Sequence, residues 1–90
     1  MKYKQGDTIT IFERDDNYLQ LYLTNEMMGR AYNAVCNGVL TKEAIESLAK
    51  SHKEWKEMIW LYYPELKKLN FTTVIEKSDR SLTIIITGSK

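Results

Sequence analysis

Residues 40–69 are LTKEAIESLAKSHKEWKEMIWLYYPELKKL, and this stretch decides the fold. Its apolar residues recur at three- and four-residue spacing, which is typical of a helix with one buried face. From residue 58 to residue 63 the sequence becomes apolar all round, so we expect this part of the helix to be covered on more than one side. The expected core stripe comprises Ile45, Leu48, Ala49, His52, Trp55, Ile59, Tyr62, Tyr63 and Leu66.

Local signals predict where this long helix begins and ends. Thr41 has the hydroxyl oxygen that accepts a hydrogen bond from a free first-turn amide, so it is the expected N-cap. Leu40 and Ile45 flank it at the spacing of a hydrophobic staple. Pro64 has no N–H to donate to the preceding turn and disfavours helical angles at Tyr63, which predicts a kink or a short new helical turn over residues 64–69.

A shorter helix is expected before the long one. Thr24 or Asn25 is its expected N-cap, because either side chain can accept a bond from a first-turn amide. Gly38 tolerates the left-handed conformation of a C-terminal cap and predicts the end of the helix. The apolar residues between them that follow helical spacing are Met27, Met28, Ala31, Ala34 and Val35.

Four strands are expected, in two hairpins. Residues 8–13 and 18–23 alternate in side-chain character, and residues 14–17 between them are the short polar side chains and arginine of a turn. Residues 71–76 and 82–87 repeat the alternation with many β-branched side chains. The predicted fold is therefore α+β in the order ββααββ, with a four-stranded, mainly antiparallel sheet and both helices packed on one face.

Alternation assigns the strand residues to two faces of this sheet. The predicted outer face carries Phe12, Tyr18, Tyr22, Val74 and Ile85, which is more apolar than a solvated sheet face should be. This surplus predicts an isologous homodimer, sheet against sheet, or an aromatic platform for single-stranded nucleic acid. The set expected to face the helices is Ile9, Ile11, Leu19, Leu21, Leu23, Phe71, Thr73, Ile75, Leu82, Ile84 and Ile86.

Composition restricts the class of protein. The 90 residues are 43% apolar and 28% charged, the profile of one small domain spanning residues 1–90. Thirteen basic and twelve acidic side chains give a net charge of +1, which argues against a protein that mainly coats nucleic acid. No apolar run is long enough for a membrane span or a signal peptide, and a single cysteine is unlike a disulfide-rich secreted domain. We therefore expect a cytoplasmic protein.

The sequence predicts no catalytic, cofactor or metal site. His52 is the only histidine, and its position between Leu48 and Trp55 predicts a structural residue in or beside the core. Cys36 is expected to be a small buried hydrophobe, the alternative being a reactive thiol. One histidine and one cysteine do not make a zinc site, and the four glycines form no phosphate-binding cluster.

A contact surface on the long helix is the remaining candidate site. Lys53, Lys56 and Trp60 fall on one flank of the apolar stripe, and Leu61 lies beyond it. A tryptophan among lysines is a plausible binding hot spot, because tryptophan supplies a large contact area. The alternative is that the first helix covers Trp60 or Leu61 within the same chain.

These observations predict a non-enzymatic, cytoplasmic protein-binding module. The size and composition suggest an inhibitor or adaptor of a larger host protein, of the kind that phages and mobile elements encode. A single-stranded nucleic-acid binder is the first alternative, and a small-ligand pocket or enzyme around His52 is the second. The expected partners are another protein and a second copy of the chain, with no membrane contact.

Overall fold

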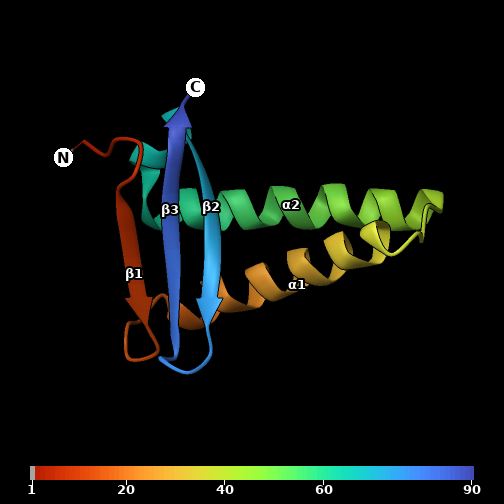
Figure 1. The fold of residues 1–90 in the computed structure, drawn as a ribbon, viewed down its shortest axis with the longest axis horizontal. Coiled ribbons are helices and arrows are strands. Elements are labelled where there is room, and N and C mark those ends of the chain that lie inside the picture. The colour runs from red at the N-terminus through yellow and green to blue at the C-terminus, as the bar shows by residue number, and fades with distance from the viewer. Residues whose placement is uncertain (1) are drawn as a thin grey trace.

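The structure is a computed structural model that describes residues 2–90. These residues form three strands, two α-helices and one 3₁₀ helix: β1 (Thr8–Phe12), α1 (Tyr18–Cys36), α2 (Lys42–Tyr62), η1 (Pro64–Lys68), β2 (Leu69–Glu76) and β3 (Ser81–Ser89). The strands make one antiparallel sheet in the order β1-β3-β2. The hairpin of α1 and α2 covers one face of this sheet and then continues past its β2 edge (Figure 1).

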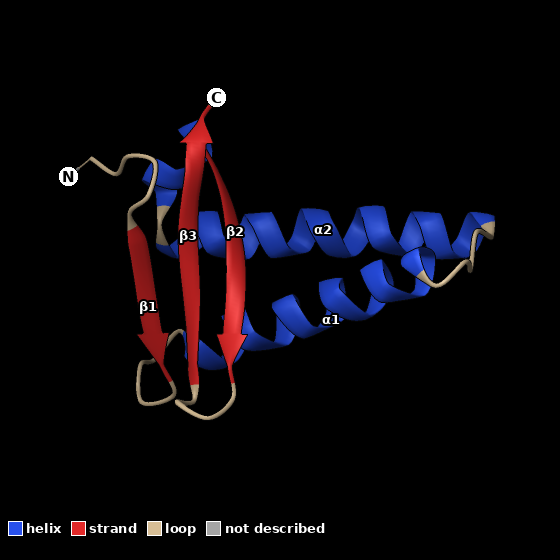
Figure 2. Cartoon of the chain, viewed as in Figure 1, coloured by secondary structure: helices blue, strands red, loops and turns tan. Residues whose placement is uncertain are grey.

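The α+β class and the antiparallel sheet are confirmed, but the predicted fourth strand is wrong. Residues 18–23 form the first turns of α1, so the element order is βααββ (Figure 2). Six alternating residues fit a helix as well as a strand: Leu21 is buried, with Tyr18 and Met28 packed on the same core. Leu19 and Leu23 then point outward and are exposed.

The predicted N-cap of this first helix, Thr24 or Asn25, is also wrong, because the N-cap is Asn17, about two turns earlier. Thr24 lies inside the helix, where its hydroxyl donates to the carbonyl oxygens of Gln20 and Leu21 at 3.1 Å each. The predicted end is confirmed. Gly38 has φ +95°, its N–H donates to the carbonyl of Val35, and the next N–H donates to that of Ala34.

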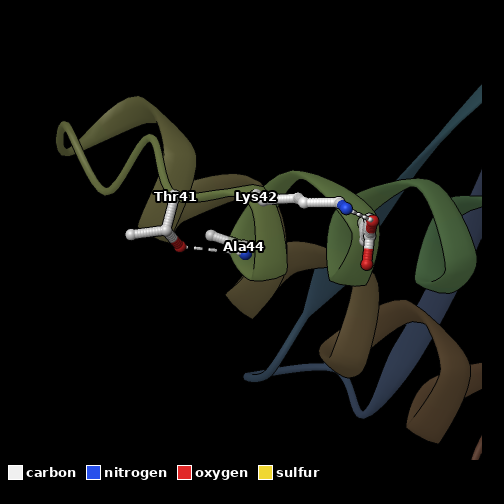
Figure 3. Close-up of polar contacts among 4 residues, drawn as sticks. Thr41, Lys42 and Ala44 are labelled. Carbon is white, nitrogen blue, oxygen red and sulfur yellow. Dashed lines mark hydrogen bonds and ion pairs between the residues drawn. The ribbon is translucent and has the colours of Figure 1, made fainter.

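The predicted ends of the second helix are confirmed. The Thr41 hydroxyl accepts the N–H of Ala44 at 3.1 Å, and in the same turn Lys42 Nζ lies 4.0 Å from Glu46 Oε1 (Figure 3). After Tyr62 the helix stops, and Pro64 opens η1 as the first residue of a new turn. That turn brings the chain directly into β2.

The core lies between the sheet and only the nearer halves of the helices. Of the predicted core stripe, Trp55, Ile59 and Leu66 are buried, whereas Ile45 and His52 are exposed. The reason is length: the 21 residues of α2 span about 31 Å, while the axes of β1 and β2 are about 10 Å apart in a three-stranded sheet. The buried apolar residues are Ile11, Leu21, Trp55, Ile59, Leu66, Leu82, Ile84 and Ile86.

The apolar end of α2 is covered on more than one side, as predicted, except at Leu61 and Tyr62, which are exposed. Ile59 is buried, and Met58 and Trp60 are half-buried against the core. Tyr63 also packs against the core. Its hydroxyl accepts a 3.2 Å hydrogen bond from Nδ2 of Asn17, the residue that immediately precedes α1. Leu61 faces away from all of these neighbours and is 70% exposed.

Candidate binding groove

A groove of about 680 Å³ lies where the helical hairpin passes the edge of β2. This volume is within the range of ligand-binding clefts. Four ring-bearing side chains line it: Tyr32 from α1, His52 and Trp55 from α2, and Phe71 from β2. The groove is therefore built from three elements that are distant in sequence, and rigid rings form much of its wall.

Trp55 anchors the floor of the groove. It is only 5% exposed, and its ring centroid lies 5.2 Å from that of Phe71 and 5.4 Å from that of His52, with interplanar angles of 46° and 36°. Tilted aromatic pairs at such distances are favourable beyond the area that they bury. These contacts hold the aromatic surface in place in the folded chain.

Asn25 fixes the same floor through hydrogen bonds. Its side-chain oxygen accepts the indole N–H of Trp55 at 3.1 Å and also the hydroxyl of Thr73. One amide on α1 thus joins α2 to β2. Because an indole N–H or a hydroxyl buried without a partner is costly, Asn25 satisfies two donors that the packing would otherwise leave unpaired.

The outer edge of β2 forms one side of the groove and is unpaired. Ile86 of β3 directs its main chain toward β1, since its N–H donates to the carbonyl of Asp7 and its carbonyl accepts the N–H of Gly6, both at 2.9 Å. Main-chain direction alternates along a strand, so the preceding residue of β3, Ile85, directs its main chain toward β2, where it lies opposite Thr72. β2 therefore bonds to β3 through every second residue, beginning at Thr72. The N–H and C=O groups of Phe71, Thr73 and Ile75 therefore point to the free edge.

The groove carries positive charge. Lys56 and Lys90 line it, and no aspartate or glutamate does so among the lining residues of the described chain. The ammonium nitrogen of Lys90 lies 5.2 Å from the ring centroid of Trp60. Trp60 follows Lys56 by one turn of α2. Both lysines are therefore at the end of the groove where β2 begins.

The structure places His52 on the groove wall, beside the core residue Trp55 and not in the core itself. The ring is exposed and contacts Trp55 from one side. Partial burial lowers the pKa of His52 from its usual 6.5, and the nearby Lys56 ammonium lowers it further. The folded protein therefore favours the neutral imidazole.

This pKa shift predicts a loss of stability in mild acid. As the pH decreases through about 6.5, the unfolded chain takes up a proton at His52 at a higher pH than the folded chain does. The contribution of His52 to the free energy of unfolding therefore decreases as the pH is lowered, until the pH is below the pKa of the folded state. We expect the melting temperature to drop less between about pH 7.5 and pH 5.5 in His52→Gln than in the natural chain. Protonation of the carboxylates lowers the melting temperature of both proteins alike, so the difference between the two drops reports on His52. Equal drops would contradict the lowered pKa of His52.

Two other predicted positions are corrected. Cys36 is exposed at the end of α1, because this part of the hairpin lies beyond the sheet. Tyr18 and Tyr22 are not on the sheet; they stack on each other along α1 with ring centroids 5.7 Å apart. They therefore add nothing to an aromatic platform on the outer sheet face.

The outer sheet face is less apolar than predicted. Phe12, Val74 and Ile85 lie on it as expected, Phe12 with the guanidinium of Arg14 4.8 Å from its ring centroid. The rest of the face is rich in hydroxyls, from Thr8, Thr10, Thr72 and Thr83, which suit contact with water. The homodimer across this face stays a prediction.

The predicted flank on α2 is divided by the structure. Lys56 belongs to the groove, whereas Trp60 and Leu61 line a separate, smaller hollow of about 310 Å³. Trp60 is half-buried against the core, so it is not a free anchor. Lys53 is exposed, and its Nζ lies 3.8 Å from Oε1 of Glu57.

No protein-family model, no curated protein and no solved structure matches this chain. Within residues 2–90, neither α1 nor α2 combines the length and apolarity needed to cross a bilayer. The same residues contain no cluster of three histidine, cysteine, aspartate or glutamate side chains placed to hold a metal ion. Function is therefore argued from the groove itself.

Proposed function

We propose that this chain is a non-enzymatic, cytoplasmic protein-binding module, an adaptor or inhibitor whose partner occupies the groove beside β2. The single observation that carries the proposal is the preformed aromatic floor at an unpaired strand edge. Trp55 and Phe71 supply that floor, and Tyr32, 54% exposed, extends it along α1. Aromatic surface that is already ordered gives contact area at little entropic cost on binding.

The alternatives have weaker support. A nucleic-acid platform on the outer sheet face retains Phe12 as its only aromatic ring in the described strands. A catalytic role for His52 lacks a carboxylate partner on the groove wall, although the ring does face the groove. A site that binds a protein needs neither a row of aromatic rings for base stacking nor a general acid and base.

The proposal predicts that Tyr32→Ala weakens partner binding about tenfold or more while the melting temperature stays nearly unchanged. Tyr32 is exposed, so its loss removes contact area for the partner but little intramolecular packing. The partner is first captured from the native host with the tagged chain, and its affinity is then measured with each purified variant.

Leu61→Ala is the matched control. Leu61 is an exposed apolar side chain outside the groove, so its truncation should leave the affinity unchanged. Weaker binding by Leu61→Ala together with normal binding by Tyr32→Ala would move the interface to the α2 flank. Capture that disappears with nuclease or moderate salt would favour nucleic acid over protein.

A further inference from the structure

We infer that the occupant of the groove is an extended acidic peptide segment that pairs antiparallel with β2 as a fourth strand. The negative charge of the segment lies toward its carboxyl end. This inference rests on the proposed function and specifies the chemistry of the partner. The free edge of β2, the overhang of the helices and the charge of the groove carry it.

The edge of β2 is suited to pairing with another strand. Natural edge strands are usually protected by shortness, lysine or proline. The eight residues of β2, LNFTTVIE, contain neither lysine nor proline, and they present the main chain of Phe71, Thr73 and Ile75. The opposite edge belongs to β1, which has only five residues, and the helical hairpin does not overhang this edge as it overhangs β2 (Figure 1).

The overhanging hairpin covers the place that an added strand would take. Both helices continue past β2 on one face of the sheet (Figure 1). Residues directly opposite each other in an antiparallel pair share a face, so partner residues opposite Phe71 and Thr73 would point toward the helices. Their side chains would meet Tyr32 and Trp55, which makes every second partner residue an apolar contact residue.

The position of the lysines decides which end of the antiparallel segment carries the negative charge. The N–H of Lys90 donates to the carbonyl of Lys68 at 3.2 Å, immediately before β2, and Lys56 lines the same end of the groove. A strand antiparallel to β2 ends where β2 begins. Its last residues therefore meet the two ammonium groups, which favour aspartate, glutamate or a terminal carboxylate.

A second copy of the chain does not fit this edge. Two β2 strands paired antiparallel are related by a two-fold axis normal to the sheet, which keeps both helical hairpins on the same face. Each hairpin extends over the edge that it shares with the other copy, so the two would occupy the same space (Figure 1). A single extended segment avoids this clash.

A displayed library of random linear peptides of about twelve residues, selected on the full chain, tests the inference. We expect enriched sequences to alternate apolar and polar residues and to carry aspartate or glutamate in their last third. An enriched peptide is then synthesised, and its contacts are mapped by amide NMR. The largest shifts should fall on Phe71, Thr73 and Ile75, and N-methylation of alternate peptide amides should abolish binding, because it removes the donors to β2 without altering the protein.

Charge is tested with paired double variants. Lys56→Glu with Lys90→Glu should weaken the acidic peptide about tenfold, as expected for two exposed charge pairs. Lys42→Glu with Lys50→Glu changes the net charge equally, but both residues are exposed and outside the groove. This control should bind normally, and equal losses in the two double variants would overturn the charge assignment.

Failure of the inference can be distinguished from failure of the proposed function. Enriched peptides without acidic residues, peptides that bind as helices, or shifts outside β2 would overturn the extended acidic segment. If no peptide binds at about 1 mM while the host partner still depends on Tyr32, the inference is overturned and the proposed function stands. If Tyr32→Ala also leaves partner binding unchanged, both are overturned.

Discussion

Trp55→Ala is expected to lower the free energy of unfolding by about 3–5 kcal/mol, the usual cost of truncating a buried tryptophan. The side chain is buried, packs on Phe71 and donates its indole N–H to Asn25, so the change removes packing and one of the two hydrogen bonds that the Asn25 oxygen accepts. A domain of this size has about 5–13 kcal/mol of stability in total, so the variant should be close to unfolded at 37 °C. Thermal and urea denaturation measure the effect.

Paired phenylalanine variants separate the two tryptophans. Trp55→Phe loses the bond to Asn25 and should destabilise the protein by about 1–3 kcal/mol. Trp60→Phe should be neutral or slightly stabilising, because the Trp60 indole nitrogen is buried without a partner within the described residues. A larger loss of stability in Trp60→Phe than in Trp55→Phe would show that Trp60, and not Trp55, is the tryptophan at the centre of the core.

Asn25→Ala is expected to cost about 1–3 kcal/mol of stability, because it leaves the donors of Trp55 and Thr73 without their shared acceptor. Since the same amide holds the groove floor, the variant should also weaken partner binding. Thr73→Val keeps the shape of the side chain and leaves Asn25 free to pair with Trp55, so it should cost less.

The double variant gives the decisive comparison for Asn25. If the amide acts by satisfying Thr73, the cost of Asn25→Ala with Thr73→Val is smaller than the sum of the single costs. Strictly additive costs in urea denaturation would mean that Asn25 and Thr73 do not depend on each other. The hydrogen bond between them would then contribute nothing to stability.

The groove could be predicted only in part from the sequence. The sequence pattern draws attention to Lys56 and His52, but it makes Asn25 only one of two candidate helix caps, with Thr24, and gives Tyr32 no role. One signal was present: Asn25 is a polar residue on the same side of the helix as Leu21 and Met28. Its partners Trp55 and Thr73 lie 30 and 48 residues away, so no local pattern could reveal the bonds.

The sequence by itself determined the elements whose signals are local. The cap at Thr41, the stop at Gly38 and the break at Pro64 act through one or two hydrogen bonds of the neighbouring backbone, so they are visible within a few residues. The alternation in β2 and β3 likewise follows from side chains that point to opposite faces along each strand.

Only the tertiary structure decided how residues 18–23 fold and which helical residues are buried. Six alternating residues suit both a strand and a helix, and the choice depends on whether Leu21 meets the core together with Met28. Burial of His52 and Ile45 depends on how many strands lie beneath α2. Three strands are too narrow for helices of this length, so part of the apolar stripe stays open as the wall of a groove.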